Sequence, residues 1–333
     1  VLEHFLRDAK EQGGVQTMSH DQRKAKVKEV VEQYIREELG DLEGQSPRFR
    51  YLFRRLCQSV ELVVQNVVEE LEHSHFQPIS FELGFGDGKA LPPVELTVDG
   101  VTLSISGIVD RVDGWAENGR LYLRVVDYKT GKKSFDLAEL RYGLGLQMLL
   151  YLFTLKEEGQ MLFGGHEIVP AGVLYTPARE PMLRCARDTE PETIEKALKK
   201  ELRRSGMVLE DPAVLQAMEH SALESPCYLP IAVKRDGAVT GSLASAEQLG
   251  KLSKYVDHIL HEITQEVFAG NIDADPYART PQQSACTYCE FASACHFENG
   301  CGSDRMEYIK ATKNDEFWQY IDEVNGEGAH ENG

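Results

Sequence analysis

The sequence predicts an α/β fold in which a central sheet is flanked by helices. Apolar residues recur at helical spacing early in the chain, β-rich runs bounded by turn residues follow, and a long apolar helix then precedes one more strand. The expected elements, in chain order, are helices at 1–10, 21–38 and 48–73, strands at 79–85, 94–98, 101–112 and 121–128, a helix at 136–158 and a strand at 171–176.

Turn and cap residues set the limits of the later elements. A polar, Gly-bounded stretch at 114–119 joins two β-rich runs, which predicts a hairpin. Ser134 or Asp136 can cap the long helix, because a side-chain oxygen there accepts from the first free N–H groups. The last strand is bounded by Pro170 and Pro177.

The chain has 333 residues, of which 42% are hydrophobic and 27% charged, so one large globular domain is expected. We expect this domain at 1–300, with its core at about 79–180, a helical peripheral insertion at about 191–268 and a cysteine segment at 286–301. Residues 302–333 are expected to be a tail with a frayed end. No apolar run reaches the ~20 residues of a membrane span and nothing resembles a targeting sequence, which favours a cytoplasmic location.

Two acids and a lysine on the hairpin suggest chemistry. Asp127 and Lys129 share one face of their strand, and an antiparallel neighbour can bring Asp110 beside them. Two carboxylates bind a hard cation such as Mg²⁺ that also takes a phosphate oxygen, and the lysine can act on the same phosphate. The pattern predicts a metal-dependent phosphodiesterase, although a motif this short also occurs by chance on solvated hairpins. Arg111 and Asp113 are interpreted as a structural surface pair.

Gln147 and Tyr151 stand out on the apolar helix. They are four residues apart and therefore share a face. A glutamine on a packed helix is most often bonded to a neighbour. Since it follows the acidic pair, it could instead orient a phosphate or a base.

Four of the seven cysteines lie close together, at Cys286, Cys289, Cys295 and Cys301. Such spacing can bring thiolates round one metal centre, and disulfides are less favoured because no signal peptide is evident. From the spacing alone zinc is favoured over an iron–sulfur cluster, since Cys301 could complete a four-thiolate set.

The net charge of −18 opposes binding to nucleic acid, because phosphate contacts need lysine and arginine. Basic residues nevertheless cluster at 129–133, beside the acidic pair, and at 196–204. Affinity for free DNA is therefore expected to be weak.

Taken in order, these motifs resemble a known family. The matching stretches are Gly107–Asp113, Val125–Thr130, Asp136–Leu152, Pro170–Tyr175 and Cys286–Cys295. Together they resemble the RecB-like branch of the PD-(D/E)xK nucleases and, within it, the AddB-type nuclease domains, over nearly the whole chain. The resemblance implies a restriction-endonuclease-like core and a metal-dependent DNA exonuclease within a two-subunit helicase–nuclease that processes double-strand breaks.

The resemblance also implies residue roles. Asp110 and Asp127 would be metal ligands for Mg²⁺ or Mn²⁺, Lys129 the catalytic lysine, and Gln147 and Tyr151 an accessory motif on the helix.

Two further residues are implied near the start of the chain. Families of this type place a histidine ligand on an early helix, which makes His4 a candidate, although a histidine there would otherwise more often face solvent or cap the helix. Glu82 sits where such nucleases often carry an acid, and by itself it reads as a charge at a strand edge.

The implied cofactors and partners follow. A [4Fe–4S] cluster would be held by Cys286, Cys289 and Cys295 with a fourth cysteine upstream of Val1, and it would join the C-terminal segment to the start of the domain. The partners would be single-stranded DNA ends from an unwound duplex and an AddA-type helicase–nuclease subunit, with the domain associated with the 5′-terminated strand.

Two other functions stay open. One is a catalytically idle nuclease-fold scaffold, against which the intact Asp110, Asp127 and Lys129 argue. The other is a zinc-stapled nucleic-acid-binding module in which the cysteines matter and the acids do not.

Overall fold

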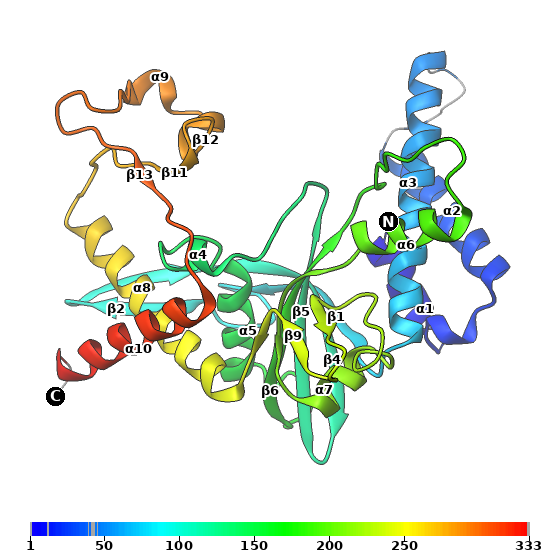
Figure 1. Ribbon diagram of the computed structural model, residues 1–333, viewed down its shortest axis with the longest axis horizontal. Coiled ribbons are helices and arrows are strands. Elements are labelled where there is room, and N and C mark those ends of the chain that lie inside the picture. The colour runs from blue at the N-terminus through cyan, green and yellow to red at the C-terminus, as the bar shows by residue number, and fades with distance from the viewer. Residues whose placement is uncertain (1, 12, 39, 41–43, 45, 332–333) are drawn as a thin grey trace. The chain divides into compact units, whose positions relative to one another are not determined.

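The computed structural model describes residues 2–11, 13–38, 40, 44 and 46–331. The chain forms two compact units, whose elements are shown in Figure 1. The sheet unit comprises Val1–Pro92, Ser106–Phe135 and Tyr151–Ala246, and the C-terminal unit comprises Pro93–Ile105, Asp136–Leu150 and Glu247–Gly333.

A mixed six-stranded sheet forms the centre of the sheet unit, in the order β1-β4-β5-β6-β7-β10. The strands are β1 (Gln77–Phe85), β4 (Gly107–Glu117), β5 (Arg120–Lys129), β6 (Glu167–Pro177), β7 (Ser205–Leu209) and β10 (Leu243–Ala244). β4 pairs antiparallel with β1 and β5, whereas β5 and β6 are parallel. A parallel pair needs a crossover, which here includes α5 (Gln147–Glu158). The predicted α/β core with a mixed central sheet is confirmed.

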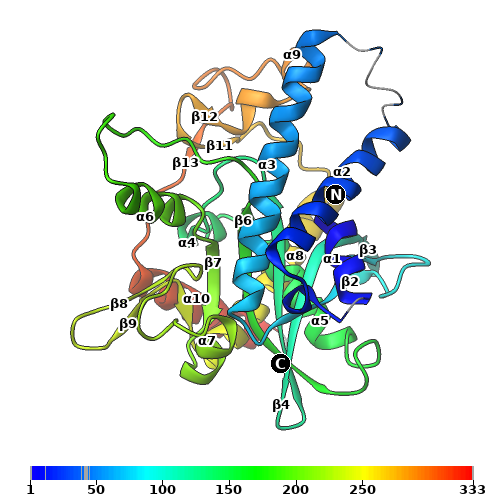
Figure 2. The same ribbon diagram turned by 90° about the vertical axis from the view of Figure 1, so that its right-hand side faces the viewer.

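Three helices cover one side of this sheet (Figures 1 and 2). They are α1 (Leu2–Glu11), α2 (His20–Glu38) and α3 (Pro47–Glu72), with a short 3₁₀ turn, η1 (Val15–Thr17), between the first two. Ser46 caps α3 by accepting a hydrogen bond from the N–H of Phe49. The apolar faces of the helices bury one cluster with β1, whose members include Phe5, Val31, Val64, Leu71 and Phe81. Removing this surface from water holds the helices on the sheet.

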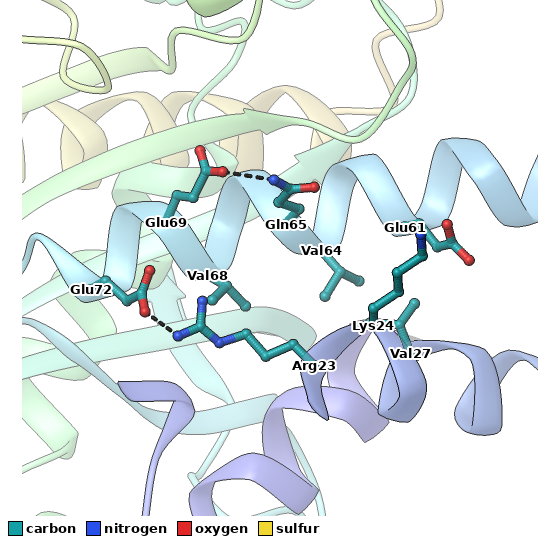
Figure 3. A pocket seen from close by; sticks show the side chains of 9 residues that line it. All are labelled: Arg23, Lys24, Val27, Glu61, Val64, Gln65, Val68, Glu69 and Glu72. Carbon is teal, nitrogen blue, oxygen red and sulfur yellow. Dashed lines mark hydrogen bonds and ion pairs between the residues drawn. The ribbon is translucent and has the colours of Figure 1, made fainter. Parts of the chain in front are cut away.

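A pocket of about 270 Å³ lies between α2 and α3 (Figure 3). Arg23 pairs with Glu72 across it, and Gln65 donates to Glu69 at 2.9 Å. Three glutamates line this pocket beside the two cations Arg23 and Lys24. This balance of charge favours packing between the helices over phosphate binding, which requires an excess of cations.

The region after β6 differs from the helical insertion that the sequence suggested at 191–268. It contains α6 (Pro191–Glu201), α7 (Pro212–Met218) and a hairpin of β8 (Ile231–Val233) and β9 (Val239–Gly241), but β7 and β10 belong to the central sheet. Gly206 allows β7 to approach β6 closely enough to pair with it, because a Cβ at this position would lie 2.0 Å from the carbonyl oxygen of Val173 on β6. Apolar runs as short as β7 cannot be told from a buried helical turn by periodicity.

The C-terminal unit contains two small sheets and several helices. The first sheet is a hairpin of β2 (Val94–Val98) and β3 (Val101–Ile105), and the second joins β12 (Gln283–Ser284), β11 (Tyr277–Thr280) and β13 (Glu307–Tyr308). The helices are α4 (Leu137–Leu140), α8 (Ala246–Phe268), η2 (Ala285–Tyr288), α9 (Ala292–Cys295) and α10 (Asn314–Glu331). Phe317 and Ile321 of α10 are buried, so the expected tail contains a helix anchored by apolar residues four positions apart.

Two predicted elements are interrupted. The helix expected at 136–158 breaks between α4 and α5, where Gly143 and Gly145 have φ values of +69° and +72°, which no right-handed helix accommodates. The strand expected at 101–112 divides at Ser106 into β3 and β4. Through the described ranges, no helix has both the length and the apolar character to cross a membrane.

Candidate active site

The hairpin of β4 and β5 sets the two predicted acids side by side. Arg111 lies opposite Val126 in an antiparallel register, so the next step of that register places Asp110 beside Asp127. Side chains alternate along a strand, and the ammonium of Lys129 accordingly lies 2.7 Å from Oδ2 of Asp127. The structure thus brings all three predicted residues together at one end of the hairpin.

Asp110 is held by the backbone of the neighbouring strand. Its Oδ2 accepts a hydrogen bond from the N–H of Tyr128 at 3.0 Å. The Tyr128 side chain leaves β5 on the face opposite Asp127 and Lys129, and its hydroxyl accepts a hydrogen bond from Arg111. Burial raises the pKa of Tyr128 to about 12, against the opposing effect of Arg111, so the hydroxyl keeps its proton at neutral pH.

The two carboxylates repel each other. Burial raises the pKa of Asp127 above its ordinary value, and the charge of Asp110 raises it further, while Lys129 and Lys133 lower it. Asp127 is only 7% exposed, so water screens this repulsion weakly. A divalent cation would relieve the repulsion, and carboxylate oxygens are the donors that Mg²⁺ prefers. The donor set therefore fits such a cation, with water and substrate oxygens completing its shell.

A pocket of about 360 Å³ adjoins Asp110. Tyr128, Glu82 of β1 and Glu3 of α1 form part of its wall, and α3 contributes an apolar side. Glu82 has a φ of +48°, a strained conformation for a residue other than glycine. Glu3 accepts a hydrogen bond from Arg7 at 2.6 Å. The sequence analysis did not predict Glu3. It could have been noticed as an acid next to the candidate histidine on the same early helix.

His4 does not join this group. Its side chain is exposed on α1 and is not part of the pocket wall to which Glu3 contributes. Successive helical residues project about 100° apart, which separates the two side chains. Nowhere in the part of the chain that the structure describes do three His, Cys, Asp or Glu side chains gather closely enough to hold a metal ion. Of the three predicted metal ligands, the structure brings Asp110 and Asp127 together and leaves His4 apart.

A buried network of charges supports the hairpin behind the site. Arg111 and Asp113 have no exposed surface and lie 2.7 Å apart, so their interpretation as a surface pair was wrong. Arg124 pairs with Asp113 at 2.9 Å and with Glu70 of α3 at 3.0 Å, and Arg204 pairs with Glu70 at 2.6 Å. Burial alone would raise the pKa of Glu70, but the three arginines together lower it to about 2. These ion pairs connect α3 to β4 and β5.

The two basic stretches noted in the sequence meet at one pocket of about 410 Å³. Its cationic side chains come from both stretches and from the segment after β6, namely Lys129, Lys132, Lys133, Arg179, Lys200 and Arg203. Glu201, the acid among the lining residues that the structure describes, lies 3.4 Å from both Lys132 and Arg179. Because Lys129 also belongs to this wall, a polyanion that reached Lys129 would meet several cations here.

The predicted accessory residues lie one turn apart on α5. Gln147 belongs to the C-terminal unit, whereas Tyr151 belongs to the sheet unit. The ring of Tyr151 meets Phe85 edge-on, with 5.3 Å between the ring centroids. A Cβ on Gly107 would lie 3.0 Å from the Tyr151 hydroxyl oxygen, so the tyrosine packs against the start of the strand that carries Asp110.

The cysteine segment does not form a metal site as it stands. Cys286 lies in η2, the N–H of Cys289 donates to the carbonyl of Cys286 at 3.3 Å, and Cys295 ends α9. All seven cysteines are free thiols, and Cys289, Cys295 and Cys301 are exposed. Within the described residues no three of these thiols converge on one centre, so they do not fit a four-iron cluster in this arrangement.

Comparison with known proteins agrees with the geometry of the hairpin. Residues 1–296 match the family model of the PD-(D/E)XK nuclease superfamily. The chain is 32% identical over 302 residues to an ATP-dependent helicase/deoxyribonuclease subunit of Ruminiclostridium cellulolyticum, which covers 90% of this chain and 26% of that protein. A protein of the same name from Desulforudis audaxviator is 34% identical over 295 residues, covering 88% of this chain and 25% of that protein.

The chain spans about a quarter of the length of these curated relatives. The family model, by contrast, covers most of the chain, including both strands of the hairpin and every residue of the site. The chain belongs to the PD-(D/E)XK nuclease superfamily.

Proposed function

We propose that this chain is a metal-dependent deoxyribonuclease domain that cleaves single-stranded DNA. One observation carries the proposal: Asp110 and Asp127 adjoin on neighbouring strands, and the ammonium of Lys129 lies 2.7 Å from Asp127. Two carboxylates with a cation beside them suit phosphodiester hydrolysis, in which negative charge builds on a phosphate.

The residues divide the chemistry between them. Asp110 and Asp127 would hold Mg²⁺ or Mn²⁺, and when bound the cation supplies an acidified water and offsets charge on the phosphate. Lys129 shares the face of Asp127 and places a second positive charge at the phosphate. Tyr128 keeps Asp110 in position through its N–H. Gln147 and Tyr151 stay proposed accessory residues, while the exposed position of His4 does not favour it as a third ligand.

The substrate proposal rests on charge. The pocket at Lys129 offers six cations in a chain whose net charge is −18. Such a local excess suits the phosphates of DNA, whereas the acidic remainder opposes tight binding of free DNA. We therefore infer that a helicase delivers the unwound strand to the site.

The names of the relatives support this inference, since they describe a subunit of an ATP-dependent helicase/deoxyribonuclease. We propose that the chain acts in the cytoplasm with an AddA-type helicase–nuclease subunit. The proposed role is repair of double-strand breaks and homologous recombination, with exonuclease action on the 5′-terminated strand.

The [4Fe–4S] cluster at Cys286, Cys289 and Cys295 stays a prediction that rests on the resemblance, since the spacing alone favours zinc. Its test is the iron and acid-labile sulfide content of the chain after anaerobic purification. Iron that is lost on Cys295→Ser would support the cluster. Stoichiometric zinc, or iron that is unaffected by this change, would reject it.

The nuclease proposal is tested with single-stranded oligonucleotides labelled at the 5′ or the 3′ end, in Mg²⁺ and in EDTA. We expect Mg²⁺-dependent release of short products, loss of at least a hundredfold in rate for Asp127→Asn, and unchanged rate for Glu117→Gln. Glu117 is an exposed acid about 23 Å farther along β4, which makes it a matched control. Equal cleavage by parent and Asp127→Asn would refute the assignment. Binding without cleavage by the parent would identify the idle scaffold instead.

A further inference from the structure

The first half of α3 has a composition unlike the rest of the chain. Residues 47–60 contain four arginines and no acid, although the whole chain has a net charge of −18. Those arginines, at positions 48, 50, 54 and 55, are all exposed. Three large apolar side chains on the same turns are also exposed, Tyr51 at 56%, Leu52 at 54% and Leu56 at 58%. Water-exposed apolar groups interleaved with arginine indicate a binding surface more than a solvated helix.

The two sides of this half-helix have different partners. Phe53, Cys57 and Val60 pack against the buried cluster of the first three helices. Tyr51 and Arg55, and likewise Leu52 and Leu56, are four residues apart, so they form two adjacent rows on the other side. We call these four residues the outer ridge. Figure 2 shows the first turns of α3 extending beyond the sheet, and all four side chains of the outer ridge are more than half exposed.

The outer ridge leads into the candidate active site. Leu56 itself lines the pocket that contains Asp110. Ser59 and Val63 continue the same side of α3 and line that pocket as well. Tyr51 and Ser59 are eight residues apart, which is about 12 Å along the helix axis. The ridge and the pocket therefore form one continuous surface, and Asp110 is one of the residues that line it.

Arg55 pairs with an exposed carboxylate and also interacts with Tyr51, its neighbour on the outer ridge. Its guanidinium lies 3.2 Å from Glu180, and the Ser59 hydroxyl lies 3.4 Å from the same carboxylate. The side chains of Arg55 and Glu180 are 56% and 46% exposed. An ion pair this exposed contributes little and is readily replaced by a phosphate group, which carries more charge.

We propose that the outer ridge of α3 binds the single-stranded DNA that is cleaved at Asp110 and Asp127. This inference rests on the proposed nuclease function and adds the path of the substrate. Unpaired bases stack on aromatic and apolar side chains, and arginine binds the intervening phosphates. A duplex hides its base faces, so this chemistry selects a single strand. Glu180 competes with DNA phosphate for Arg55.

The test measures equilibrium binding of a fluorescein-labelled single-stranded oligonucleotide to the full chain, by anisotropy, in an Asp127→Asn background that prevents cleavage. We expect Tyr51→Ala to weaken binding about fivefold or more and Tyr51→Phe to keep it, because stacking needs only the ring. Arg55→Glu should weaken binding at least tenfold and lower the salt dependence by about one counterion. Glu180→Gln should strengthen binding severalfold.

Arg50→Glu is the matched control. It makes the same change of charge on the same exposed turns, but Arg50 lies about 140° round the helix from Arg55. Equal weakening by Arg50→Glu and Arg55→Glu would overturn the proposal, since the effect would then be one of general charge. Unchanged affinity in both Tyr51→Ala and Arg55→Glu would also overturn it and leave the ridge as a contact for another protein.

Failure of this proposal is distinguishable from failure of the nuclease assignment. If Asp127→Asn still cleaves DNA, the assignment is wrong whatever the ridge binds. If Asp127→Asn abolishes cleavage while the ridge variants bind DNA as tightly as Asp127→Asn alone and, made in the parent chain, cut it at the parent's rate, only the ridge proposal is wrong. Thermal unfolding of each ridge variant should match that of Asp127→Asn alone, because the side chains replaced at positions 50, 51, 55 and 180 are exposed.

Discussion

The backbone N–H of Tyr128 donates a hydrogen bond to the carboxylate of Asp110 across 3.0 Å. Tyr128 is in turn held by Arg111, a member of the buried ion network. Tyr128 therefore links the Asp110 carboxylate, which its N–H binds, to the buried ion network, which its hydroxyl contacts. Asp127 and Lys129 lie on either side of it in β5. Substitutions can separate three effects: the charge of the Asp110 carboxylate, the hydrogen bond that positions it, and the contribution of the buried ion network to the free energy of unfolding.

Asp110→Asn is expected to remove the charge and keep the position. An asparagine oxygen can still accept from the Tyr128 N–H, so the free energy of unfolding should change by less than about 1 kcal/mol. Cleavage should fall at least a hundredfold, because one of the two charged metal ligands is lost. Asp110→Ala should lose as much activity and about 1 kcal/mol more stability, measured by urea unfolding. If Asp110→Asn cleaves at the rate of the parent, Asp110 is a structural acceptor only.

Lys129→Ala should lower kcat, whereas Lys132→Ala should raise KM. Lys129 is 2.7 Å from Asp127, whereas Lys132 lies on the wall of the basic pocket with a side chain 76% exposed. Loss of a charge that acts in the transition state lowers kcat, by about 10²–10³ for one preorganised group. Loss of a phosphate contact raises KM and leaves kcat unchanged. Steady-state kinetics on single-stranded DNA give both constants, and a reversed pattern would exchange the two roles.

A divalent cation should stabilise the folded chain through the acidic pair. Asp110 and Asp127 repel each other in its absence, and this repulsion contributes to the raised pKa of Asp127. Mg²⁺ at about ten times its dissociation constant stabilises by about 1.4 kcal/mol, which would raise the Tm by about 2 °C. The shift should vanish in Asp127→Asn and persist in Glu117→Gln. A shift of equal size in Asp127→Asn would place the cation elsewhere.

Glu70→Gln should destabilise the protein by about 3–5 kcal/mol, because it leaves buried arginines without their carboxylate. The pKa of Glu70 is about 2 in the folded chain, below its ordinary value of 4.5. A lowered pKa contributes stability that is fully present above pH 4.5 and is lost as the pH falls through about 2. The unfolding free energies of parent and Glu70→Gln should therefore converge over that range.

The control for this prediction is Glu69→Gln. Glu69 is the preceding residue of α3, is only partly buried and accepts a hydrogen bond from Gln65 at 2.9 Å. Glu69→Gln should lower the free energy of unfolding by less than about 0.5 kcal/mol, and the variant's stability should depend on pH as the parent's does. Equal losses for the two substitutions would show that the network contributes nothing beyond the helix itself.

Much of the fold followed from local patterns. The helices at the start of the chain and the strands β1, β2, β5 and β6 lie close to where periodicity and turn residues predicted them. Periodicity failed at β7, which is short and reaches the sheet only because Gly206 allows close approach to Val173. It also failed between α4 and α5, where two left-handed glycines interrupt an otherwise apolar helical run.

Some residues of the candidate site could likewise be predicted from the sequence, and others could not. Asp110, Asp127 and Lys129 were predictable because a hairpin brings its strands together by local pairing, and its register follows from the alternation of side chains. Glu3 and Arg204 were not predictable, because each reaches its partners from a distant part of the chain. The arginine-rich start of α3 was visible in the sequence, but its function could not be inferred until the helix was seen to lead to Asp110.

By itself, the sequence determined the α/β class, the family resemblance and the acidic pair with its lysine, since these depend on residue types and short spacings. The tertiary structure decided which charges are buried together, which acids share the pocket with Asp110, and that two separate basic stretches line one pocket. The reason is physical: burial and Coulomb energy depend on distances between residues far apart in the chain, and only packing sets those distances.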